Sequence, residues 1–179
     1  MISSFLEGKA TDINKAIGAA LLVAMPLLSS GGLAQGASAN PKMPFQGSAS
    51  TSQGTHNDGY GLKAVDFRLP AGTPVLAPEN AVVISTCNAG NNHRAIKLRA
   101  GTRYFSLIHV NTANIYVGKT YLQGQMIGTV AGDRPWNNCA KSTGAHLHFG
   151  VSPSSPVVDG VNIANLRVGT VLRSTNYRR

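Results

Sequence analysis

The sequence predicts an all-β fold, an antiparallel sheet or sandwich with long connecting loops. After residue 39, short runs rich in Val, Ile, Leu, Thr and aromatic residues follow one another at close spacing and are separated by Gly, Pro and Asn. Such punctuation is typical of all-β domains. No stretch of residues 40–179 sustains the 3.6-residue period of an amphipathic helix. A chain of this length is expected to form one domain with one hydrophobic core.

The expected strands, in chain order, are residues 73–77, 81–85, 95–99, 103–110, 125–130 and 147–151. The sequence Ala-Ile-Lys-Leu-Arg at 95–99 alternates apolar and polar side chains, which is the pattern of a strand with one buried face. The Gly-containing segments 89–92 and 101–102 indicate hairpin turns. Residues 40–61 are mainly Gly, Ser, Thr, Asn and Gln, so we expect them to be mostly loop.

The N-terminal segment has the three parts of a secretory signal peptide. Lys9 and Lys15 precede an apolar run at 16–28, and small residues end in Ala37-Ser38-Ala39. The sequence therefore predicts a signal peptide at 1–39 and a secreted or periplasmic domain at 40–179. A retained membrane anchor is the alternative, but the apolar run is shorter than the ~20 residues needed to cross a bilayer.

The chain is strongly basic, with a formal net charge of +9. This charge does not by itself indicate a nucleic-acid partner, because an exported basic protein is also attracted to anionic polymers outside the cell. We expect no nucleic-acid partner, no stable membrane anchor after signal cleavage, and a monomer.

Only two cysteines are present, Cys87 and Cys139. In an oxidising compartment an even pair most simply forms one disulfide. The competing use, as zinc thiolates, lacks a Cys-x-x-Cys spacing. We therefore expect a disulfide.

Two histidines stand one residue apart in the last expected strand. Because side chains alternate along a strand, His146 and His148 point to one face while Leu147 and Phe149 enter the core. Two adjacent imidazoles repel when protonated and need separate hydrogen-bond partners when neutral. A metal ion resolves both problems, since zinc binds neutral imidazole nitrogen. The alternative is a pair of half-exposed surface histidines.

A catalytic zinc site has three protein ligands and an open position. Asp66 is an unusual acid, because it stands between apolar neighbours in Lys63-Ala64-Val65-Asp66-Phe67, where an unpaired carboxylate would be costly. His56 lies in a polar segment. Each alone has an ordinary explanation, a solvated loop histidine or an acid at a strand end.

Four ordered motifs resemble the lysostaphin-like zinc endopeptidases, peptidase family M23, and within them the secreted β-lytic and staphylolysin-type branch. The motifs are His56 followed by Asp66-Phe67, the run at 70–77, His109, and Gly144-Ala145-His146-Leu147-His148-Phe149. The resemblance extends over about residues 43–177. It also implies a disulfide between Cys87 and Cys139.

The resemblance implies one zinc ion per chain, with His56, Asp66 and His148 as metal ligands. It implies catalytic roles for His109 and His146, which would face the reacting water and the substrate. Ser106 is a competing candidate for the first of these positions, but the distance from His109 to the next glycine motif favours His109. Strand alternation would place His109 on the same face as Phe105 and Leu107.

The function that this resemblance implies is a secreted zinc metalloendopeptidase. It would hydrolyse peptide cross-links of bacterial peptidoglycan, at Gly-Gly or D-Ala-containing bonds, by metal-activated water. The main alternative is a non-catalytic relative of the same fold that binds cell walls or activates an amidase. A polymer-binding β-sandwich that uses Trp136 is a second alternative. His93, in a polar turn, is expected to be an ordinary surface histidine.

Overall fold

The computed structural model describes residues 40–133 and 137–179, and the expected all-β fold is confirmed for them. Their elements are β1 (Gly47–Asn57), β2 (Lys63–Arg68), β3 (Pro74–Leu76), β4 (Ala81–Asn88), β5 (His93–Ala100), β6 (Arg103–Asn111), β7 (Thr120–Tyr121), β8 (Met126–Val130), β9 (Leu147–Val151), β10 (Val157–Val158), β11 (Val161–Asn162), the 3-10 turn η1 (Ile163–Asn165) and β12 (Val171–Ser174). All six expected strands are present, with ends that differ by a few residues.

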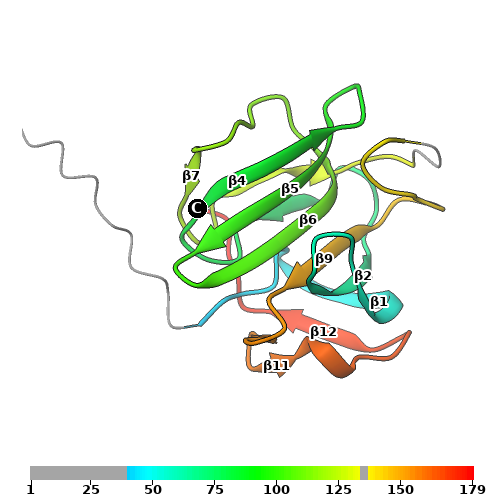
Figure 1. The fold of residues 1–179 in the computed structure, drawn as a ribbon. Helices are drawn as coiled ribbons and strands as arrows, with labels where there is room; N and C mark the ends of the chain where they lie inside the picture. Colours follow the sequence, from blue (N-terminus) through cyan, green and yellow to red (C-terminus); the bar gives the residue numbers. More distant parts are fainter. Residues whose placement is uncertain (1–39, 134–136) are drawn as a thin grey trace, which may run out of the picture. The chain divides into compact units, whose positions relative to one another are not determined.

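The main sheet is antiparallel and has the strand order β12-β1-β2-β9-β6-β5-β4-β7. Strand β8 pairs with both β3 and β6, and β10 pairs with β11 in a separate ribbon. Strand β9 therefore lies between β2 and β6 at the centre of the sheet (Figure 1). Segments that are far apart in the sequence, around residues 66, 107 and 148, are adjacent in the fold because of this order.

One face of the β2-β9-β6 trio is a hydrophobic core. Leu147, Phe149 and Val151 of β9 are fully buried in it, which confirms the alternation predicted for Leu147 and Phe149. The ring of Phe149 stacks on that of Phe105 with centroids 6.0 Å apart, and Phe67 of β2 lies 6.5 Å away on the other side. These rings fix the register of the three strands, since a one-residue slip would expose them.

The prediction that residues 40–61 are mostly loop is wrong, because residues 47–57 form strand β1. This strand pairs with β12 on one side and with β2 on the other. Its polar composition reflects partial exposure, since only Ala49 and Thr51 of its side chains are buried. Long-range pairing here overrides the low strand preference of Gly, Ser and Asn.

The predicted signal segment, residues 1–39, lies outside the described residues, and so does Trp136. Among the residues that the structure describes, no helix has the length and apolar character needed to cross a membrane.

The expected disulfide is present and joins Cys87 of β4 to Cys139. Cys139, Ala140 and Lys141 also line the cleft that contains the clustered histidines. The bridge therefore ties one wall of this cleft to the sheet.

Removing the bridge should lower stability because it closes a loop of 52 residues. A loop of that length stabilises the folded state by roughly 4 kcal/mol in the chain-entropy model. We expect the Cys87→Ala, Cys139→Ala double variant to lose about that much free energy of unfolding in urea titrations. The reduced wild-type protein is the control, and a variant as stable as the oxidised wild type would contradict the expectation.

Candidate metal centre

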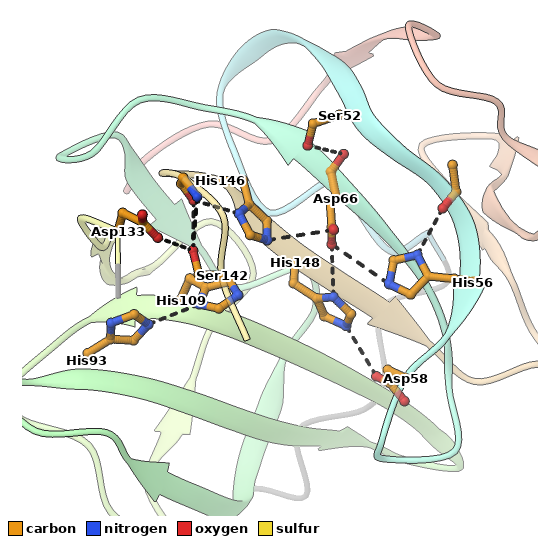
Figure 2. A network of polar contacts seen from close by, with 12 residues as sticks. Ser52, His56, Asp58, Asp66, His93, His109, Asp133, Ser142, His146 and His148 are labelled. Carbon is orange, nitrogen blue, oxygen red and sulfur yellow. Dashed lines mark hydrogen bonds and ion pairs between the residues drawn. The ribbon is translucent and has the colours of Figure 1, made fainter. Parts of the chain in front are cut away.

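Three strands bring His56, Asp66 and His148 together. Asp66 of β2 pairs directly with His148 of β9, and His56 of β1 pairs with Ala64, two residues before Asp66. Directly opposed residues of an antiparallel pair, and residues two apart on one strand, share a face. One potential ligand atom from each of the three residues lies within 4.8 Å of the others, so the group can hold a metal ion (Figure 2).

Hydrogen bonds orient the ring nitrogens of this group. His56 Nδ1 donates to the carbonyl oxygen of Gly54 at 2.9 Å, because a carbonyl can only accept. His56 Nε2 then carries a lone pair and lies 3.9 Å from Asp66 Oδ1. His148 Nδ1 lies 2.9 Å from the same oxygen. Both imidazoles thus direct a nitrogen toward one carboxylate oxygen.

His146 borders the same group. Its Nδ1 donates to the carbonyl oxygen of Gly144 at 2.9 Å, which leaves Nε2 facing Asp66 Oδ2 at 3.7 Å. The predicted shared face of His146 and His148 is confirmed, since both contact Asp66.

His109 packs against His146, with ring centroids 4.4 Å apart. The expectation that His109 shares a face with Phe105 and Leu107 is wrong, although those two side chains are in the core. Arg94 pairs with Val110 and Ala95 pairs with Ile108, so His109 is the extra residue of a β-bulge. Its φ of +64° is unusual for a residue other than glycine. The bulge turns the imidazole toward His146.

His93 is not a surface histidine, and that prediction is wrong. His93 is only 3% exposed. Its Nε2 lies within hydrogen-bond distance of His109 Nδ1, at 3.0 Å (Figure 2). The polar turn before it gives no sign of burial. His93 pairs with Asn111, and this pairing of β5 with β6 places it beside the bulge.

Burial and charge act in opposite directions on the acids and bases of the group. Burial would raise the pKa of Asp66, but the hydrogen bond with His148 and the nearby imidazoles lower it overall. Burial would lower the pKa of His148, but Asp58 and Asp66 raise it overall. Burial, followed by the neighbouring His146 and His93, lowers the pKa of His109 to about 3. His109 is therefore neutral at ordinary pH.

Asp58 is a residue of the centre that the sequence did not reveal. Its Oδ2 lies 3.6 Å from His148 Nε2, an ion-pair contact that is longer than a hydrogen bond. Burial would raise the pKa of Asp58, but His148, the Ser106 hydroxyl and two backbone N–H groups lower it to about 2. Ser106 itself donates to Asp58 rather than facing His146. In the sequence, only its position two residues after His56 could have drawn attention to it.

The three residues fit a zinc ion. Two imidazoles and one carboxylate form a donor set that catalytic zinc sites use. Asp58 and Asp66 add negative charge that favours a cation. His148 Nε2 is buried, has no hydrogen-bond partner within the described residues and lies 3.6 Å from Asp58 Oδ2, so Nδ1 is the ring nitrogen that faces Asp66 and His56. The centre opens into a cleft of about 510 Å³.

A model of peptidase family M23 matches residues 60–160, more than half of the chain. This range contains Asp66, His109, His146 and His148, and begins just after His56.

Individual proteins are also similar. An uncharacterized metalloprotease of Haemophilus influenzae is 35% identical over 89 residues, which are 49% of this chain and only 18% of that protein. The structure of LytU is 26% identical with a TM-score of 0.42, over 69% of this chain and 83% of that chain. The catalytic domain of the antimicrobial peptidase lysostaphin from Staphylococcus simulans is 20% identical with a TM-score of 0.42, over 69% of this chain and 88% of that chain.

The family model covers more than half of the chain, and the structure assembles the metal-binding group His56, Asp66 and His148. The chain therefore belongs to peptidase family M23.

Proposed function

We propose that the protein is an exported zinc endopeptidase that hydrolyses peptide cross-links of bacterial peptidoglycan. The observation that carries this proposal is the grouping of His56, Asp66 and His148 beside two further imidazoles on the floor of an open cleft. Membership of family M23 supports peptide hydrolysis. One zinc ion per chain and a monomeric state remain predictions.

The proposed ligand atoms are His56 Nε2, an oxygen of Asp66 and His148 Nδ1, which are the atoms that the strands direct at one another. Zinc in such a site supplies a Lewis acid that polarises a peptide carbonyl and acidifies a water molecule. The protein contributes a buried, fixed donor set, since Asp66 is 7% and His148 8% exposed.

His109 and His146 are proposed to move protons and to stabilise charge on the substrate. Their rings contact each other, and His146 Nε2 faces the ligand carboxylate. His109 is neutral because of its low pKa, so one of its nitrogens can accept a proton and the other can donate one. Neutral imidazole N–H groups can also donate to an oxygen that gains negative charge.

Export and the cell wall are supported by three features. The Cys87–Cys139 disulfide supports export, because disulfides form and persist in oxidising compartments outside the cytosol. The predicted signal peptide agrees with it. The net charge of +9 favours association with anionic wall polymers. The cleft of about 510 Å³ is lined by the metal-binding group and by His109 and His146, so a peptide bound in it would lie against them.

Substitutions should separate metal binding from catalysis. We expect His148→Ala to abolish both bound zinc and wall lysis, because it removes a ligand. His109→Ala and His146→Ala should each retain zinc and lose a factor of about 10²–10⁴ in turnover, the usual contribution of a positioned acid or base. Metal analysis and turbidity loss of purified walls measure the two quantities. Zinc or lysis retained by His148→Ala would exclude the assignment.

The fall of activity at acidic pH should be caused by loss of zinc. A base whose pKa is lowered to about 3 takes up its proton only near that pH, so His109 stays neutral from pH 7 to pH 5. Imidazole ligands must be deprotonated to bind metal, so acidification weakens zinc binding. We expect turnover and bound zinc to fall together over this range, and added free zinc to restore turnover. A fall in turnover with zinc still bound would contradict this expectation.

The scissile bond can be identified with purified walls of two types, glycine-bridged and directly cross-linked. Mass spectrometry of the released peptides would show new termini at Gly-Gly bonds or at D-Ala-containing bonds. If zinc-loaded protein releases peptides from neither type of wall, the protein would instead be a non-catalytic relative of the same fold.

A further inference from the structure

Asp58 is the most firmly held carboxylate next to the metal-binding group, yet it is not one of the three grouped residues. Its Oδ1 accepts the backbone N–H of Tyr60 at 2.9 Å and that of Leu62 at 2.8 Å. Its own backbone N–H donates to the carbonyl oxygen of Leu62 at 3.0 Å. The loop after β1 therefore closes on this side chain, which is 1% exposed.

A second strand fixes the other carboxylate oxygen. Ser106 of β6 is fully buried and donates its hydroxyl to Asp58 Oδ2 at 2.6 Å. Three donors from the loop and from β6 thus hold the carboxylate, which still has acceptor capacity on Oδ2. That oxygen faces His148 Nε2 at 3.6 Å, as the lower part of Figure 2 shows.

Gly150 provides the space for this arrangement. It pairs with Ser106 on one side and with Ala64 on the other, and it lies two residues after His148 on the same face of β9. A Cβ at position 150 would approach Asp58 Oδ2 to 2.7 Å and would collide with the Ser106 hydroxyl. The carboxylate thus lies where a side chain of β9 would otherwise be.

We propose that Asp58, held by Ser106 above Gly150, is a positioning residue that fixes the ring and the tautomer of His148. The inference rests on the proposed function, since it concerns how this chain presents a zinc ligand. In the structure Nδ1 donates to Asp66 Oδ1 at 2.9 Å. A metal ion bound at Nδ1 would take the place of that proton. The carboxylate of Asp58, 3.6 Å from Nε2, then favours keeping the one remaining N–H at Nε2. Carboxylates that orient ligand histidines in this way are a general feature of metal sites.

The Asp58→Asn variant tests the orientation with almost no change in volume. If the amide oxygen stays with the N–H groups of Tyr60 and Leu62, the NH₂ group faces His148 and favours a proton on Nδ1. If the amide is reversed, its NH₂ group opposes those two backbone donors. Either arrangement weakens the ligand, and loss of such an orienting partner typically costs 10–100-fold in metal affinity. We expect a rise of that size in the zinc dissociation constant, measured by competition with a chromogenic chelator.

Matched controls use the same changes elsewhere. Asp159 accepts the backbone N–H of Met43 at 2.7 Å and lines a different cavity, so Asp159→Asn should leave zinc affinity unchanged. Ser106→Ala should raise the zinc dissociation constant less than Asp58→Asn does, because it removes one of three donors. Ser152→Ala, which removes a buried hydroxyl that accepts from the Tyr104 N–H at 2.7 Å, should not raise it.

Cobalt substitution separates positioning from direct coordination. At saturating cobalt, the visible absorption bands of Asp58→Asn should match those of the wild type, because the ligand set is the same. A changed band pattern would overturn the inference by making Asp58 a ligand. A zinc dissociation constant within about threefold of the wild type, against the 10–100-fold expected, would also overturn it.

If Asp58→Asn does not fold, Ser106→Ala against Ser152→Ala decides the matter, and equal zinc affinities of those two variants would overturn the inference. No cell-wall substrate is needed for any of these measurements. A wild-type protein that binds no zinc would refute the proposed function itself, whereas normal zinc binding by all variants would refute only the role of Asp58.

Discussion

The register of β2 against β9 is the constraint on which the site depends. Asp66 lies directly opposite His148, and the flanking Val65, Phe67, Leu147 and Phe149 all point into the core. A slip of one residue would bury the two polar side chains in the core and expose the apolar ones. The free energy that holds the sheet together, mainly burial of these apolar side chains, therefore also holds the metal-binding atoms in place. Folding and assembly of the centre are one event.

Regular strand geometry supplies His56, Asp66 and His148, but the remaining imidazoles need irregular backbone. His109 adopts a left-handed conformation in a bulge, which costs of order 1–3 kcal/mol for a residue other than glycine. The backbone offsets part of this cost, since the His109 carbonyl accepts the N–H of Ala131 at 2.7 Å. His93 holds the ring from the far side. A strained residue retained beside a metal-binding group is consistent with a functional reason for its position.

This difference explains what could be predicted from the sequence. The alternation of side chains along a strand correctly predicted that His146 and His148 share a face. The apolar neighbours of Asp66 indicated a buried acid that needs a partner. These are local signals. The turn of the His109 side chain, the burial of His93 and the approach of Asp58 to His148 each depend on pairing between strands distant in the chain, which no local pattern encodes. Strand β1 was missed for the same reason, since β2 and β12 rather than its own residues make it a strand.

Charge balance links Asp58 to the rest of the centre. Asp58 and Asp66 both have a lowered pKa and are ionised at neutral pH, so together they carry the charge that one divalent cation neutralises. With only one of these carboxylates, a bound dication would leave a net positive charge beside His109 and His146 and would further disfavour their protonated forms. With both, the two imidazoles lie next to a nearly neutral centre, where gaining a proton during a reaction costs less. If Asp58 orients His148 as proposed, it would also set the electrostatic conditions for the proton transfers proposed for His109 and His146.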